Sequence, residues 1–149
     1  MGDADVMGGT RRLVVFTLAG EEYGVPITMV QEIIRHGRPR PIPGGPAHVQ
    51  GVINLRGRII PVVDLRARFG LHGDRPADEK VVIVALGDLT VGVVVDEVSE
   101  VLSIDPEVCE PAPPGTDGAD FVDAVGKLDG RLVVVLDPVR LLDERALAA

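Results

Sequence analysis

The sequence has little of what most enzymes and metal proteins use at their sites. It has one cysteine, Cys109, so no intramolecular disulfide can form. Tryptophan is absent and aromatic residues make up only 3% of the chain, which predicts a core of aliphatic side chains. The three histidines, at positions 36, 48 and 72, have neither metal-ligand spacing nor a cysteine partner. No glycine-rich loop precedes a helix, so the residue pattern does not favour an enzyme.

Long apolar runs and an excess of basic charge are also missing. The longest apolar runs are strand-sized and interrupted by charge, so we expect neither a signal peptide nor a transmembrane helix, and a soluble cytoplasmic protein. The net charge of −8 argues against a broad nucleic-acid-binding face. However, residues 35–68 hold seven arginines and one acid, while residues 74–149 hold 17 acids and six bases. This asymmetry is either chance on a solvated surface or a positive patch for a carboxylate-rich partner.

Short strands separated by turns dominate the expected structure. Eighteen glycines and twelve prolines punctuate β-branched runs of five to seven residues, which predicts an all-β protein with short helical turns. Asp64 and Gly70 are expected to cap one such turn at Leu65–Phe69, and Asp137 is expected to cap a short C-terminal helix. Residues 1–10 are small and polar, so we expect a disordered tail.

The sequence contains an internal repeat. A shift of 68 residues places Gly24 on Gly92, and a shift of 73 places the segment 55–60 on 128–133. Each half is therefore a five-strand unit of about 60 residues, which is small for an independent domain, so we expect two units that share an interface. The predicted boundaries are 13–70 for the first unit, 71–79 for a linker and about 80–143 for the second, within a domain at 11–145.

A tight turn joins the two strands around position 56. Gly57 supplies a positive φ, which predicts a type I turn closed by a bulge. The repeat also predicts that Gly57 and Gly130 lie in matching turns.

The stretch around this turn, residues 51–70, reads GVINLRGRIIPVVDLRARFG. It resembles the signature of the CheW family of bacterial chemotaxis coupling proteins, and the similarity also takes in YGVPI and VQEI near position 30, residues 92–98 and residues 128–142. The resemblance implies two SH3-like five-stranded β-barrels packed together. It also implies a scaffold that binds no cofactor.

The resemblance further implies two partners. Family members bridge the regulatory domain of the histidine kinase CheA and the cytoplasmic hairpin tip of methyl-accepting chemotaxis receptors, in arrays at the membrane. Arg56 and Glu32 match positions that the family uses for partner contacts, although Arg56 could be a solvated turn residue and Glu32 a feature of the repeat. The predicted partner-binding residues are Val30, Glu32, Gly51, Ile53, Asn54, Arg56 and Val98.

Two functional hypotheses remain open from the sequence. The runs Val49–Ile53 and Val91–Val95 hold more apolar residues than one buried face needs, which predicts an apolar groove that receives a receptor helix. The alternative is a small-ligand or enzymatic module that uses the crevice between the two barrels.

Overall fold

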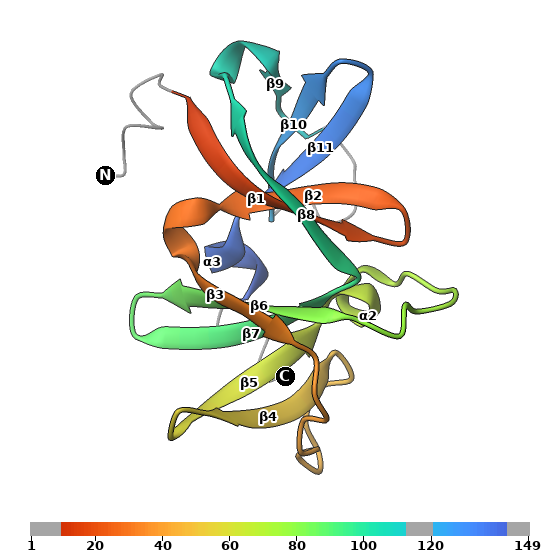
Figure 1. The fold of residues 1–149 in the computed structure, drawn as a ribbon, viewed down its shortest axis with the longest axis vertical. Helices are drawn as coiled ribbons and strands as arrows, with labels where there is room; N and C mark the ends of the chain where they lie inside the picture. Colours follow the sequence, from red (N-terminus) through yellow and green to blue (C-terminus); the bar gives the residue numbers. More distant parts are fainter. Residues whose placement is uncertain (1–9, 113–120, 143–149) are drawn as a thin grey trace.

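The computed structural model describes residues 10–112 and 121–142, and Figure 1 shows two sheets stacked along the long axis of the molecule. Sheet A contains, in spatial order, β8 (Glu97–Ile104), β1 (Arg11–Leu18), β2 (Glu21–Pro26), β11 (Arg131–Leu136), β10 (Val122–Leu128) and β9 (Cys109–Glu110). Sheet B contains β3 (Val30–Arg35), β6 (Lys80–Leu86), β7 (Leu89–Val95), β5 (Arg58–Asp64) and β4 (Val49–Leu55). The helical pieces are η1 (Ile27–Met29), α2 (Leu65–Phe69), η2 (Pro106–Val108) and α3 (Pro138–Leu141).

The all-β class and the short helices are confirmed. The carboxylate of Asp64 accepts a hydrogen bond from the backbone N–H of Arg66, and Gly70 closes α2 in the left-handed conformation, as predicted. Asp137 caps α3 in the same way. The predicted tail at 1–10 lies outside the described residues apart from Thr10, and so do the last predicted domain residues, 143–145.

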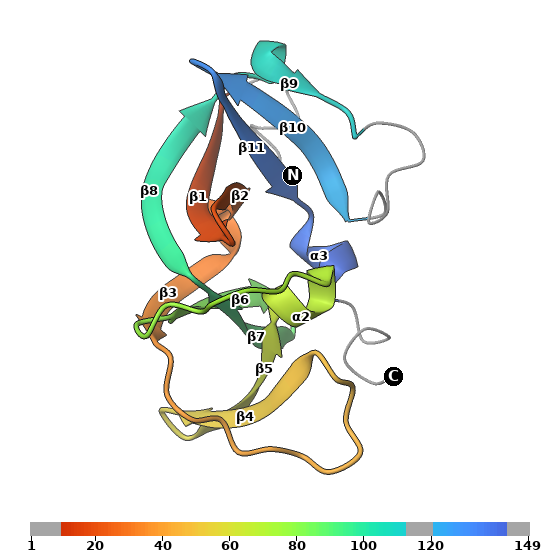
Figure 2. The same cartoon turned by 90° about the vertical axis from the view of Figure 1, so that its right-hand side faces the viewer.

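In each sheet the chain that leaves one end strand leads to the strand at the other end. In sheet B the chain that leaves β3 runs beside β4, where the backbones of Arg40 and Val52 exchange two hydrogen bonds of 2.9 Å. In sheet A the chain that leaves β8 passes through η2 into β9, which pairs with β10. Chain continuity therefore links the first and last strands of both sheets (Figure 2), and closure of the two sheets into barrels stays a prediction.

The predicted boundaries inside the chain are wrong, because the two halves exchange strands. The hairpin β1–β2 belongs to sheet A, where it lies between β8 and β11 of the other half. The hairpin β6–β7 likewise completes sheet B, between β3 and β5. Residues 13–70 and 80–143 thus each contribute to both sheets instead of forming one barrel each.

The repeat itself is visible in the strand register. Val62 pairs with Gly92 where β5 runs parallel to β7, and Val135 pairs with Gly24 where β11 runs parallel to β2. The shift of 73 residues relates Val62 to Val135, and the shift of 68 relates Gly24 to Gly92, so the two pairs are equivalent in the repeat. Each sheet is therefore two strands of one half inserted into three strands of the other, with the short β9 added to sheet A.

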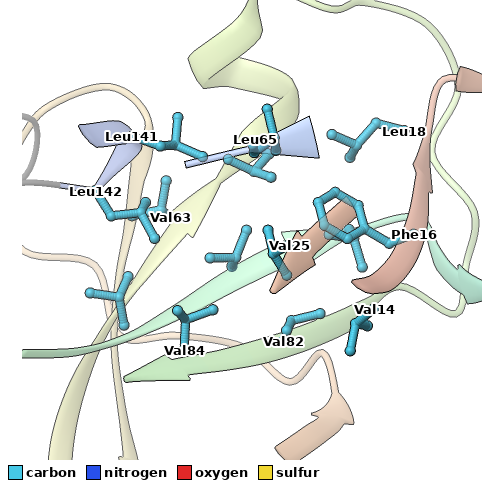
Figure 3. Packing of buried hydrophobic residues seen from close by; sticks show 14 residues of the cluster. Val14, Phe16, Leu18, Val25, Val63, Leu65, Val82, Val84, Leu141 and Leu142 are labelled. Atoms are coloured by element: carbon cyan, nitrogen blue, oxygen red, sulfur yellow. The ribbon is translucent and has the colours of Figure 1, made fainter. Parts of the chain in front are cut away.

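The core has three layers because several strands are apolar on both faces. On β1, Leu13 and Val15 point into sheet A, whereas Val14, Phe16 and Leu18 face sheet B. The strand β6 alternates in the same way between the interior of sheet B and the layer between the sheets. Figure 3 shows this middle layer, which is the largest cluster and includes side chains from both sheets, α2 and α3.

All four aromatic side chains of the protein form one row. The ring centroids lie 6.0 Å apart for Phe16 and Tyr23, 5.5 Å for Tyr23 and Phe69, and 5.4 Å for Phe69 and Phe121. The guanidinium of Arg68 lies 5.0 Å from the centroid of Phe121. The row runs from β1 and β2 of sheet A to α2, which follows β5 of sheet B, so the scarce aromatic residues are concentrated where the sheets meet.

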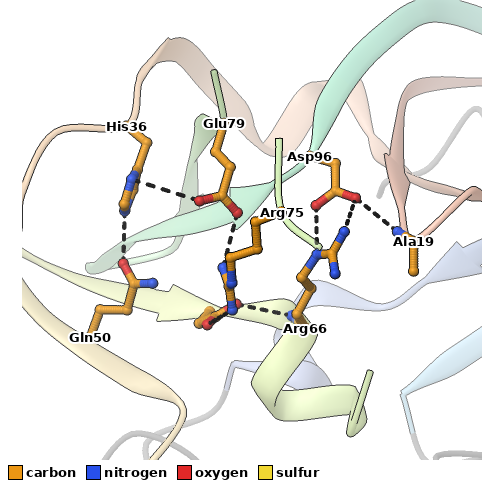
Figure 4. Close-up of polar contacts among 8 residues, drawn as sticks. Ala19, His36, Gln50, Arg66, Arg75, Glu79 and Asp96 are labelled. Carbon is orange, nitrogen blue, oxygen red and sulfur yellow. Dashed lines mark hydrogen bonds and ion pairs between the residues drawn. The ribbon is translucent and has the colours of Figure 1, made fainter. Parts of the chain in front are cut away.

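A buried ion pair also ties the sheets together (Figure 4). Arg66 of α2 donates two hydrogen bonds to Asp96, at 2.8 and 2.6 Å, and the side chains are only 5% and 11% exposed. Asp96 accepts a third, 2.8 Å bond from the backbone N–H of Ala19 in the β1–β2 turn. Burial raises the pKa of Asp96, but the bonds from Arg66 and Ala19 outweigh it, so the pKa lies below its ordinary value.

The substitution Asp96→Asn is expected to destabilise the protein most at neutral pH. Arg66 would lose its charged partner while buried, which costs about 2–3 kcal/mol, below the range for fully enclosed pairs because Asp96 keeps some exposure. Since the folded pKa of Asp96 is lowered, its stabilisation is present above the unfolded pKa of about 4 and is lost as pH falls through the folded value. Denaturant melts across this range check the result, with Asp88→Asn in an exposed turn as control. A stability difference that does not shrink on acidification would contradict it.

Candidate functional site

The candidate site begins at the turn between β4 and β5. Arg56 and Gly57 have positive φ angles of 52° and 84°, and Leu55 pairs directly with Arg58. This is a two-residue type I′ turn, so the predicted type I turn with a bulge is wrong. The β10–β11 turn has the same geometry, with φ of 46° and 81° at positions 129 and 130, which confirms the prediction that the turns match.

Arg56 and Glu32 form a bidentate ion pair across the seam of sheet B, which is the line where the end strand β3 approaches β4 and the β4–β5 turn. One nitrogen of Arg56 donates a 2.8 Å hydrogen bond to Oε1 of Glu32, and Nη1 donates a second to Oε2. The hydrogen bond from Arg56 holds the pKa of Glu32 below its ordinary value. The Arg56 side chain is 72% exposed and that of Glu32 is 25% exposed. The pair therefore presents an ordered guanidinium at the surface, between β3 and the β4–β5 turn.

The second half shows that the fold does not require an arginine in this turn. Asp129 occupies the position that corresponds to Arg56. The glutamate that corresponds to Glu32 is Glu100, and it pairs with Arg131 on β11, at 2.8 Å. Arg131 also binds Glu22. The turn arginine thus distinguishes sheet B from sheet A, and a purely structural explanation of Arg56 is weakened.

Gly51 and Asn54 have local structural roles beside this pair. Gly51 has a φ of 146°, and a Cβ there would lie 2.0 Å from the carbonyl oxygen of Arg40. Only glycine therefore lets the chain after β3 approach β4. The side-chain oxygen of Asn54 accepts a 2.8 Å hydrogen bond from the backbone N–H of Gly57, which stabilises the turn that carries Arg56. Both residues position the site, and direct contact with a partner stays a prediction.

The substitution Gly51→Ala is expected to destabilise sheet B. The new Cβ would collide with the Arg40 backbone, and alanine at this φ adds strain of about 1–3 kcal/mol before the chain moves. The loop would then separate from β4, and amide hydrogens at Arg40 and Val52 would exchange faster. Chemical denaturation and hydrogen exchange measure both effects. Gly57→Ala is the matched control, because its Cβ meets no atom and only the strain of its positive φ remains. Equal losses in both variants would contradict the proposed collision.

The three predicted apolar site residues are half-buried and support the core. Val30 pairs with Val84 and packs against the layer between the sheets, as does Val98 on β8. Ile53 packs against the interior of sheet B. The structure therefore places Ile53 on β4 with Gly51 and Asn54, and Val30 on β3 near Glu32, but Val98 lies in sheet A.

The predicted apolar groove is only partly present. Val91–Val95 is buried throughout, because its second face packs in the layer between the sheets, so this run forms no groove. Between the sheets, described side chains from both sheets line a cavity with a volume of about 10 Å³. This is about the space of one water molecule, so this cavity is too small for the ligand of the alternative hypothesis.

An open concavity does lie on the outside of sheet B. It has a volume of about 380 Å³ and is lined by Arg38, Arg40, Val52, Ile53, Asn54 and Ile59. The sequence prediction included Ile53 and Asn54 but missed Ile59, which is 66% exposed. Strand alternation in the sequence could have identified Ile59, because Ile60 points inward and its neighbour on the strand must then point outward.

The described residues were also compared with the patterns of a metal site and of a membrane-spanning helix. Over 10–112 and 121–142, no group of three or more histidine, cysteine or acidic side chains could hold a metal ion. Among the described helices, none is both long and apolar enough to cross a bilayer. Two interlocked sheets with an apolar layer between them, an exposed ion pair and an open concavity define a protein-interaction module.

The comparisons with known proteins agree with this class. Residues 12–146 match the CheW-like domain. The chain is 38% identical to the chemotaxis protein CheW of Klebsiella aerogenes, covering 93% of this chain and 85% of that one, and 34% identical to that of Bacillus subtilis, covering 91% and 88%. The crystal structure of the scaffolding protein TtCheW from Thermoanaerobacter tengcongensis superposes with a TM-score of 0.85 at 35% identity, over 94% and 97% of the two chains.

The chain belongs to the CheW family. The relatives are named as chemotaxis and scaffolding proteins, and none of these names is that of an enzyme.

Proposed function

We propose that this protein is a non-catalytic adaptor that couples the regulatory domain of the histidine kinase CheA to the cytoplasmic tips of methyl-accepting chemotaxis receptors. Membership of the CheW family and the naming of relatives as chemotaxis and scaffolding proteins support this proposal. In this proposal the protein works in the cytoplasm, within receptor arrays at the membrane.

The observation that carries the proposal is the exposed ion pair of Arg56 and Glu32. A guanidinium that is ordered by a carboxylate of its own chain loses little side-chain entropy on binding. The Arg56 guanidinium can also bind a carboxylate of a partner protein, and this leaves no buried charge without an opposite charge. Arginine with a bidentate fork is well suited to such recognition. These properties fit a contact residue better than a residue needed for folding.

The proposal is tested by reconstitution. Receptor signalling fragments, the kinase and this protein are combined, and autophosphorylation of the kinase is measured with and without the adaptor. We expect receptor-dependent activation only when the adaptor is present, and we expect it to bind each partner separately. If the protein binds neither fragment, or the receptors control the kinase equally well without it, the proposed function is wrong.

A further inference from the structure

Sheet A neutralises the arginine that follows its β10–β11 turn with two carboxylates of its own. The guanidinium of Arg131 donates hydrogen bonds of 3.0 and 2.6 Å to Glu22 on β2 and one of 2.8 Å to Glu100 on β8. These bonds raise the pKa of Arg131 above its ordinary value. The charge of Arg131 is therefore balanced within the protein.

Sheet B lacks one of these carboxylates at the equivalent position. The shift of 73 residues relates Arg58 to Arg131, and the shift of 68 relates Glu22 to Thr90. Thr90 offers a neutral hydroxyl, and a nitrogen of the Arg58 guanidinium donates a 3.1 Å hydrogen bond to its oxygen. The repeat thus keeps the arginine and replaces its first carboxylate by a hydroxyl.

The second carboxylate is kept in sheet B, but another arginine binds it. Glu32 corresponds to Glu100, and it pairs with Arg56 in the turn. Arg58 is exposed and forms no ion pair with any described residue. Its positive charge therefore has no carboxylate where sheet A has Glu22. An exposed arginine of this kind attracts an external carboxylate, most strongly at low ionic strength.

The surroundings of Arg58 fit a loop of a folded domain better than a helix. A docked helix needs apolar contacts along its length, at its positions i, i+3, i+4 and i+7. Asn54, Arg56 and Gly57 are exposed around Arg58 and offer no apolar stripe, and Ile59 adds one apolar contact on β5. Of the two partners in the proposed function, the kinase regulatory domain is the folded domain, whereas the receptor tip is a helical hairpin.

We propose that Arg58 is a further contact residue for the kinase regulatory domain and binds an aspartate or glutamate of that domain. The carboxylate of the kinase takes the place beside Arg58 and Thr90 that Glu22 holds in sheet A. Arginine selects for a carboxylate because its planar fork can donate two parallel hydrogen bonds. The inference rests on the proposed function, since it names the kinase as the partner at this site and excludes the receptor tip from it.

The test places the missing carboxylate within the chain itself. Binding of the kinase regulatory domain and of a receptor-tip fragment is measured by calorimetry. In Thr90→Glu the new carboxylate is expected to pair with Arg58 and to repel the carboxylate of the kinase, so the kinase domain should bind on the order of 30-fold more weakly or worse. Thr90→Gln has the same size without the charge and should bind nearly as well as the wild type.

A second variant keeps the test decisive if Thr90→Glu does not fold, because Thr90 is buried. Arg58→Gln changes an exposed side chain, so its melting temperature should stay close to that of the wild type while binding of the kinase domain weakens to the same degree. Salt should weaken the wild type more than Arg58→Gln, because the variant has lost the ion pair. Arg12→Gln removes an exposed arginine from sheet A and should bind normally.

The outcomes separate this inference from the proposed function. If the wild type binds neither probe, the proposed function fails and the inference fails with it. If the wild type binds the kinase domain and Arg58→Gln binds it equally well, only the inference is overturned. Weaker binding of the receptor fragment by Arg58→Gln, with unchanged binding of the kinase domain, would assign the site to the receptor and would also overturn it.

Discussion

A cut within the linker 71–79 is expected to leave each of the two resulting fragments unfolded on its own. The hairpin β1–β2 would lose both of its neighbours in sheet A, and β6–β7 would lose both of its neighbours in sheet B. The layer between the sheets takes side chains from both halves, so neither fragment can bury its apolar strands. A chain of about 70 residues with an incomplete core has too little buried surface to offset its conformational entropy.

The two fragments are expected to regain the fold when they are mixed in equal amounts. Circular dichroism reports the strands, and fluorescence of Tyr23, the only tyrosine, reports the layer between the sheets. The control is the intact chain with a protease site in the linker, cleaved after folding, which should keep its native spectrum as a non-covalent complex. A cooperative melting transition from either fragment alone would show that the strand exchange is not essential.

The sequence predicted the local structure well because local signals determine it. The caps at Asp64 and Asp137 and the turn glycines follow from side-chain chemistry and backbone sterics, which depend on few neighbours. The pairing of the strands could not be predicted in the same way. A repeat gives the same pattern whether its strands pair within a half or between halves. The apolar run Leu13–Leu18 was a signal, because a strand that is apolar on both faces needs two packing partners.

The candidate site was predictable only in part for a related reason. Glu32 and Arg56 are 24 residues apart, and they meet because the sheet curls until β3 lies near the β4–β5 turn. Closure of a sheet depends on the loop that bridges its ends, and the bridge at Arg40 needs the space left by Gly51. The sequence shows that a glycine occupies position 51, but it does not show which segment approaches it. The concavity beside Ile59 was missed for the same reason.

The substitution Arg56→Glu is expected to abolish receptor-dependent kinase activation without unfolding the protein. Arg56 is 72% exposed, so loss of its pair with Glu32 should leave the melting temperature nearly unchanged. At a desolvated interface, however, a reversed charge meets the partner's carboxylate, and binding should weaken on the order of 30-fold or more. Thermal melting and kinase activity in the reconstituted complex measure the two effects on the same sample. Asp129→Arg, a charge reversal in the matching turn of sheet A, is the control and should keep full activity.

The charge swap Glu32→Arg/Arg56→Glu then decides what the pair does. The swap restores an ion pair at the seam, with the two charges exchanged between positions 32 and 56. If the pair served only to hold the seam together, the swapped protein would recover activity. If Arg56 contacts the partner directly, the swapped protein stays inactive, because a carboxylate now stands where the partner expects a guanidinium. We expect the inactive result. Recovered kinase activity in the swapped protein would assign the pair a structural role and remove Arg56 from the partner interface.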